Sequence, residues 1–179
     1  MNILLTIAGI IVGLVVLVLL LALILPKAYA VERNIVINRP VNTVFDYVLL
    51  LRNQEQFNAW QHIDPNVRRT YTGTDGTLGF TMAWDSDNKQ AGKGEQEITR
   101  IAPGQEVEYQ VRFIAPFPGV AKVYIRLAKE GETATHAFWG MSSRMNYPMN
   151  ILLLIMNMDK MLGKEMTRSL GMLKEHLEK

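Results

Sequence analysis

The side chains able to move a proton near neutral pH are few, and none lies in a recognisable catalytic motif. The histidines are His62, His136 and His176. His176 lies among charged residues near the end of a predicted helix, and His136 falls on the outer face of a predicted strand, so we expect both to be solvated. His62 lies in a loop that leads into the predicted sheet, two residues before Asp64. We take His62 and Tyr109 as candidates for acid–base catalysis or ligand contact.

The acidic residues are not spaced as a metal site. Residues 85–88 read Asp-Ser-Asp-Asn, like the start of a calcium loop, but Lys89 and Gln90 follow where an EF-hand loop needs an acidic or amide side chain and then a glycine. Glu95 and Glu97 share a strand face that is predicted to be solvated. The chain has no cysteine, which excludes thiolate ligands, thiolate nucleophiles and disulfides. We therefore expect no metal and no cofactor.

The charge of the chain argues against a nucleic-acid partner. Nineteen basic residues stand against seventeen acidic ones, which gives a formal net charge of +2. This excess is small and its charges are scattered, whereas a nucleic-acid surface needs a concentrated basic patch.

Residues 3–25 contain no charged side chain. As a helix rising about 1.5 Å per residue they would be roughly 35 Å long, enough to cross a hydrocarbon core about 30 Å thick. A cleaved signal peptide is the alternative, because Ala28-Tyr29-Ala30 has the small-x-small form of a cleavage site. The apolar run is longer than a signal peptide needs, and no basic residue precedes it, so we predict a membrane anchor over residues 1–27 and one domain over residues 28–179.

Basic residues flank only one end of this span. Lys27, Arg33 and Arg39 follow it, so the positive-inside rule predicts that residues 27–179 lie in the cytoplasm. Gly9 and Gly13 form a small-xxx-small step that would permit a weak homodimer, although glycine is also common in spans that do not pair.

The remaining sequence changes its hydrophobic period twice. Residues 31–37 alternate as a strand, a helix is predicted after Pro40, and a second short helix is predicted over residues 53–60. From Val67 the period is two for about seventy residues, with turn signals between the runs, which indicates an antiparallel meander. A long helix is predicted after Pro148, reaching nearly to Lys179. This order predicts an α+β fold with the terminal helix lying across a curved antiparallel sheet.

Large apolar side chains occupy one face of the predicted strands, and eight of the ten methionines lie between Met141 and Met172. Such residues most often fill a core, but flexible methionines also suit the wall of a binding pocket. Both interpretations stay open on periodicity alone.

Several short motifs in a fixed order resemble one known superfamily. They are VERNIVINRP at residues 31–40, Val44-Phe45, residues 79–84, GKGE at residues 92–95, Trp139-Gly140-Met141 and MDKMLGK at residues 158–164. In this order, residues 29–178 resemble the START-like superfamily, also called SRPBCC or helix-grip, in its polyketide cyclase/dehydrase-like branch with an N-terminal anchor. The resemblance implies a sheet of about seven strands wrapped around the long terminal helix, with two short helices after the first strand.

The resemblance also implies a function. It implies a cavity between the sheet and the terminal helix that accepts a small hydrophobic molecule such as a lipid, a quinone or a polyketide-like compound, in a single-pass protein of a bacterial inner membrane. One alternative is a cyclase or dehydrase in which His62 or Tyr109 moves a proton, and another is a tethered protein-interaction module. The residues expected to contact the ligand are Trp60, Phe80, Met82, Trp84, Tyr109, Val111, Phe113, Val123, Ile125, Trp139, Met158 and Leu162.

Overall fold

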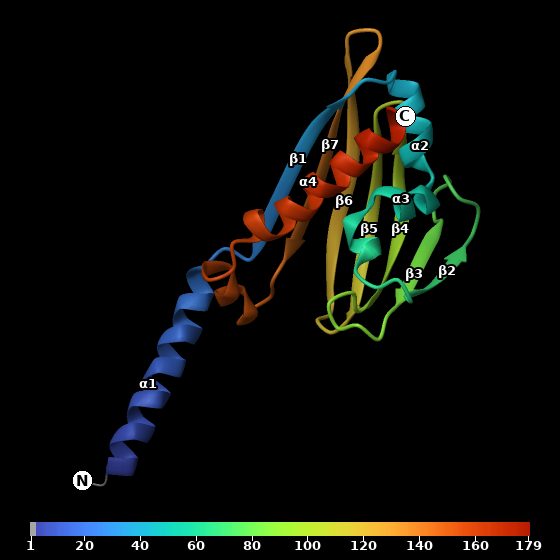
Figure 1. Cartoon of the computed structure of the whole chain (residues 1–179). Helices are drawn as coiled ribbons and strands as arrows, with labels where there is room; N and C mark the ends of the chain where they lie inside the picture. The colour runs from blue at the N-terminus through green and yellow to red at the C-terminus, as the bar shows by residue number, and fades with distance from the viewer. Residues whose placement is uncertain (1–2) are drawn as a thin grey trace.

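The computed structural model describes residues 3–179 and separates a long N-terminal helix from a folded domain (Figure 1). Helix α1 (Ile3–Ile24) extends away from the domain, and Ala22 is its one buried residue. Within the described residues, α1 is the one helix long and apolar enough to cross a membrane. Its side chains otherwise face outward on all sides, so the folded domain does not bury this helix.

The domain is built on one antiparallel sheet of seven strands in the order β1-β7-β6-β5-β4-β3-β2. Strands β2 to β7 therefore each pair with the strand next to them in sequence, whereas β1 pairs with β7, the last strand. The alternation in the sequence is the cause, since one residue in two faces the core. The strands are β1 (Ala28–Ile37), β2 (Arg68–Thr72), β3 (Thr81–Asp85), β4 (Lys93–Ala102), β5 (Glu106–Ala115), β6 (Gly119–Glu130) and β7 (Ala134–Arg144). The predicted α+β helix-grip fold is confirmed.

Short helices follow β1, as predicted, but their boundaries differ from the prediction. Helix α2 (Val41–Leu49) begins after Pro40. The second helix predicted over residues 53–60 is instead three short turns, which are η1 (Leu51–Asn53), α3 (Gln54–Phe57) and η2 (Ala59–His62). Asn58 breaks the run because its backbone is extended and its side chain accepts a hydrogen bond from the Trp60 amide.

The helix predicted after Pro148 is divided in two. A 3-10 turn, η3 (Met149–Leu154), comes first, and helix α4 (Met158–Leu177) follows. Asn157 separates them, since its Oδ1 accepts the Lys160 amide at 2.8 Å and so caps the start of α4. Only α4 lies across the sheet, whereas η3 lies beside the end of α1 (Figure 1).

The concave face of the sheet is covered in two parts. Helix α2 packs on β5, β6 and β7 near the end of the sheet that lies away from α1, where the interior is solid. Helix α4 runs along β1, and Ser169 joins it to η2 by accepting the Ala59 amide at 2.9 Å. The N-terminal half of α4 lies over the other part of the sheet, nearer α1, where the interior is hollow.

Candidate functional site

The hollow part of the domain is a cavity of about 490 Å³, within the size range of pockets that hold small organic ligands. Its wall comes from the inward faces of the strands, the η2 turn and the start of α4. It reaches the surface beside Phe117, which is 78% exposed, and Met161, which is 48% exposed. Eight of the predicted contact residues line it: Trp60, Trp84, Val111, Phe113, Val123, Trp139, Met158 and Leu162.

All three tryptophans of the chain lie on this wall. Trp60 and Trp139 meet edge to face, with their ring centroids 6.0 Å apart. The Trp84 ring lies against Gly94, where a Cβ atom would come within 2.5 Å of it, so only glycine leaves room for the indole. The Trp84 indole N–H donates to the Ala91 carbonyl at 3.1 Å, which fixes the ring in the wall.

Methionines supply the side of the wall that faces α1. Five of them line the cavity, namely Met141, Met145, Met156, Met158 and Met161. Unbranched thioether side chains change rotamer at little cost, so this side can adjust to ligands of different shape. The clustering of methionines in the sequence therefore corresponds to a wall and not only to packed core.

One polar side chain on the sheet lies in this apolar wall, and the sequence analysis missed it. Gln96 is on β4, between Met82 of β3 and Val111 of β5 in the strand register. It is 6% exposed, lines the cavity, and makes no side-chain hydrogen bond within residues 3–179. Its amide faces the cavity and is not shut off from solvent without a partner, so Gln96 is suited to bind a polar group of a ligand in place of water. The sequence did carry a signal for this residue, because a glutamine occupies an inward-facing position of the strand, between Gly94 and Ile98.

Four predicted contact residues lie in the solid core instead of the cavity wall. They are Phe80, Met82, Tyr109 and Ile125, each nearly or fully buried. The Tyr109 hydroxyl donates to the Val48 carbonyl in the last turn of α2 at 3.0 Å. Burial raises the pKa of Tyr109 well above its ordinary value. Alternation places these side chains on the inner face but does not say which part of that face is hollow.

The histidine candidate also lies away from the cavity. His62 Nε2 is 2.8 Å from the Glu55 carbonyl oxygen, and His62 is not among the lining residues. Asp64 does line the cavity, but its carboxylate accepts hydrogen bonds from the Ser86 hydroxyl and the Asn66 amide. These bonds hold the pKa of Asp64 below its ordinary value, and the bond from Ser86 has the largest effect. The Asp64 carboxylate therefore remains ionised and is a poor general acid.

An ion pair fixes the start of α4 over the sheet. Arg33 of β1 donates two hydrogen bonds to the Asp159 carboxylate, at 2.9 and 2.8 Å, and a third to the Asp159 carbonyl. The guanidinium lies against Gly163, where a Cβ would come within 2.1 Å of it. The absence of a side chain at Gly163 thus lets β1 and α4 approach closely, which holds Met158 and Leu162 in the wall.

A second hollow, of about 730 Å³, lies between the end of α1, the start of β1 and the segment that contains η3. Its lining includes Leu25, Pro26, Asn150 and Ile155. Three side chains line both hollows and therefore stand between them: Tyr29, Met156 and Met158. The cavity of about 490 Å³ is thus separated from the hollow at the end of α1 by one layer of mostly flexible side chains.

Comparison with known proteins agrees with this architecture. The family model described as polyketide cyclase / dehydrase and lipid transport matches residues 29–178. No curated protein matches the chain significantly. Among solved structures, protein CV1439 from Chromobacterium violaceum is similar with a TM-score of 0.58 and 16% identity, over 84% of this chain and 97% of that one.

Two further solved structures have the same fold, one in a dimer and one in a di-domain protein. The Aha1 dimer from Colwellia psychrerythraea is similar with a TM-score of 0.57 and 13% identity, over 84% of this chain and 96% of that one. The di-domain ARO/CYC StfQ from the steffimycin biosynthetic pathway has a TM-score of 0.61 and 10% identity, over 85% of this chain and 51% of that one. At such identities these similarities establish the fold alone.

Proposed function

Because the chain belongs to the polyketide cyclase/dehydrase and lipid transport family, whose fold is of the SRPBCC type, we propose that residues 28–179 bind a small, mostly apolar molecule. The observation that carries the proposal is the cavity of about 490 Å³, which is walled by tryptophans and methionines and is faced by the amide of Gln96. Apolar burial provides the affinity, at about 25 cal/mol per Å², and the amide selects a ligand with one polar group.

Binding is better supported than a cyclase or dehydrase reaction. A catalytic acid or base must lie within hydrogen-bond reach of its substrate. The hydroxyl of Tyr109 is bonded to Val48 in the core, and His62 lies against the Glu55 backbone, both outside the cavity wall. The one carboxylate in the wall, that of Asp64, is engaged by Ser86 and Asn66.

We further propose that α1 is an uncleaved anchor. The small-x-small residues Ala28, Tyr29 and Ala30 pair with Arg144, Ser143 and Ser142 in β7. Cleavage after Ala30 would remove these three pairs and take Tyr29 out of both hollows, so the domain makes use of the residues that a signal peptidase would remove. This supports an uncleaved, single-pass anchor, and we propose a bacterial inner membrane as its location.

The flanking charges support a cytoplasmic domain, since Lys27, Arg33 and Arg39 follow α1. A weak homodimer through Gly9 and Gly13 remains a secondary proposal. Both glycines are open to close approach, because a Cβ added at either would meet nothing within 4 Å.

The test compares two matched variants of the full-length chain, extracted from membranes in polymer-bounded nanodiscs. Val123→Phe fills the cavity, because Val123 lines it. Val120→Phe adds the same bulk on the same strand at an exposed position outside the wall. Native mass spectrometry with organic extraction should find a small molecule that Val120→Phe retains and Val123→Phe loses, whereas lipids around α1 should be retained by both.

Added ligands provide a second measurement, because every tryptophan lies in the wall. Oleic acid, decylubiquinone or a phosphatidylethanolamine should change the tryptophan emission saturably in the wild-type chain and far less in Val123→Phe. If no extracted molecule separates the two variants and no compound alters the emission, ligand binding is refuted and an interaction module becomes the better proposal.

A further inference from the structure

Residues 145–158 form an uncharged, mainly apolar segment between Arg144 and Asp159. Its length is in the range typical of interfacial segments and is too short to cross a bilayer. It is not a core segment either, because several of its large apolar side chains are exposed. Leu154 is 63% exposed and Ile155 is 80% exposed, and Tyr147 and Met149 are also exposed.

This segment is attached to the end of α1. Asn150 is fully buried, and its Nδ2 donates to the Ala22 carbonyl at 2.7 Å and to the Leu25 carbonyl at 3.2 Å. The Ala22 carbonyl belongs to the last turn of α1 and Leu25 directly follows the helix, where carbonyls have no partner within the helix. Asn150 therefore satisfies the helix end from a distant part of the chain and holds η3 beside that turn.

The attachment fixes the depth of η3 in a membrane. Helix α1 has 22 residues, so it is about 33 Å long, against about 30 Å of hydrocarbon. If the span fills the bilayer, its last turn lies at the boundary between acyl chains and headgroups. The side chains on η3 and after it then lie at the same boundary, where exposed apolar groups are stabilised by burial in lipid.

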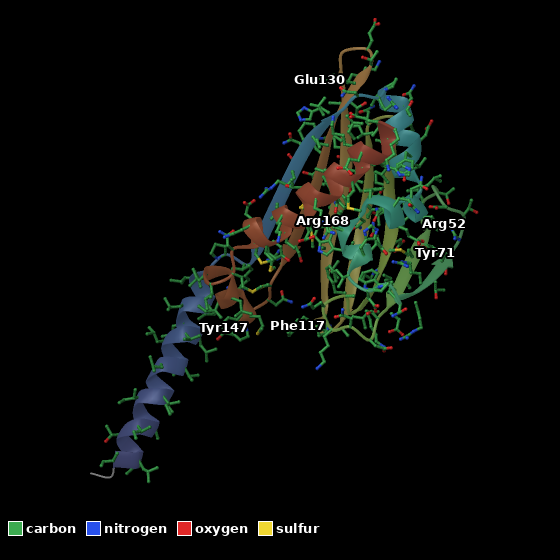
Figure 2. All side chains as sticks on the ribbon, in the orientation of Figure 1. Arg52, Tyr71, Phe117, Glu130, Tyr147 and Arg168 are labelled. Atoms are coloured by element: carbon green, nitrogen blue, oxygen red, sulfur yellow. The ribbon has the colours of Figure 1, made fainter. Side chains whose placement is uncertain are left out.

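A second apolar group lies at the same end of the domain. Phe117, in the loop between β5 and β6, is 78% exposed and borders the cavity mouth. Figure 2 shows Phe117 and Tyr147 at the end of the domain from which α1 leaves, and Glu130 at the opposite end. We call Phe117, Tyr147, Met149, Leu154 and Ile155 the apolar rim.

We propose that the apolar rim inserts into the surface of the bilayer that α1 crosses, so that the cavity exchanges its ligand with the lipid phase directly. The proposal rests on the anchor of the proposed function. The partner is the lipid surface itself, because the rim is uncharged and is held beside the last turn of the span. The layer formed by Tyr29, Met156 and Met158 then lies between the bilayer and the binding cavity.

Site-specific fluorescence tests this in the full-length chain, which has no cysteine and so gives no background labelling. Ile155→Cys and Phe117→Cys are labelled with the environment-sensitive dye NBD and reconstituted in phosphatidylcholine vesicles. Leu14→Cys, in the middle of α1, reports the anchor, and Glu130→Cys, at the far end of the domain, is the matched exposed control. Lipids spin-labelled near the headgroup or near the chain end, and aqueous iodide, serve as quenchers.

We expect the labels at positions 155 and 117 to be quenched by shallow spin-labelled lipid and shielded from iodide, and the label at 130 to behave in the opposite way. The label at 14 should be quenched by the deep spin label. If the label at position 14 is quenched by the deep spin label but the labels at positions 155 and 117 are quenched only by iodide, the apolar rim is in water. The inference about the rim is then wrong, while the proposed anchor stands. Shielding of 155 and 117 from both quenchers would mean that protein covers the rim, which also refutes the inference. Lack of quenching at 14 would refute the anchor itself.

Discussion

Replacing Gln96 with leucine is expected to change stability and ligand affinity in opposite directions. Gln96 is 6% exposed in an apolar wall, and its amide opens on the cavity, where water can pair with it in the ligand-free chain. Holding an amide in such a partly compensated apolar setting costs about 0.5 to 2 kcal/mol, and leucine of similar size removes that cost. For a domain of this size, each kcal/mol corresponds to about 2 to 4 °C, so the Tm of the ligand-free Gln96→Leu chain should rise by several degrees.

The effect on affinity depends on the ligand. A neutral hydrogen bond contributes about 0.5 to 1.5 kcal/mol, so loss of the amide should weaken a ligand with a hydroxyl by roughly 2- to 13-fold. Naphthalene and 2-naphthol differ only by that hydroxyl, and calorimetric titration of the full-length chain should show the loss for 2-naphthol alone. Gln110→Leu, on the outer face of the neighbouring strand β5, is the control and should change neither affinity.

Two outcomes would contradict this reasoning about Gln96. A lower Tm for Gln96→Leu would mean that the amide makes a stabilising interaction in the ligand-free domain, so that it is not free to bind a ligand. An equal loss of affinity for naphthalene and 2-naphthol would mean that leucine has altered the shape of the wall. The amide would then not be what selects a ligand with a polar group.

Three further predictions concern the core, the surface and the topology. Tyr109→Phe removes the donor to the Val48 carbonyl, so it should lower the free energy of unfolding by about 1 to 3 kcal/mol in thermal unfolding. It should leave ligand affinity unchanged. A loss of binding without a loss of stability would mean that Tyr109 contacts the ligand. The Lys122 ammonium, bonded to the Glu108 carboxylate, together with Arg100, holds the pKa of Glu108 below its ordinary value of about 4.3. Its stabilising contribution should therefore be complete above that value and be lost as the pH falls through the lower pKa of the folded state, so Glu108→Gln should flatten the acid limb of the unfolding profile. A phosphatase fused after Lys179 should be inactive and a fluorescent protein at the same position active, and the reverse would place the domain outside the cytoplasm.

The periodicity of the sequence predicted the sheet and its inner face well, because alternation is a local property. Val111 and Val123 were placed correctly on the inner face, and so were Tyr109 and Ile125, although only the two valines line the cavity. What alternation could not supply was the division of that face into a solid part under α2 and a hollow part under α4. This division depends on where helices distant in sequence come to lie.

Local polar signals explain the other differences. The helix predicted after Pro148 takes no account of Asn157, whose side chain caps α4 and so separates it from η3. Gln96 was overlooked because the inner faces were identified by their apolar members, although a polar residue at an inward position is the more informative exception. The role of Asn150 could not be predicted from sequence, since its partners Ala22 and Leu25 lie more than a hundred residues earlier.

The bond from Asn150 to the end of α1 also has a consequence for the order of assembly. Ala22 leaves the ribosome 128 residues before Asn150. At roughly 5 to 20 residues per second, the last turn of α1 is made about 6 to 26 seconds before the side chain that completes it. If α1 is the anchor proposed above, it can enter the bilayer during that interval while its final carbonyls are satisfied by water or headgroups. The contact between α1 and η3 can form only after Asn150 has been synthesised, so in that case the domain would acquire its position at the membrane late in folding.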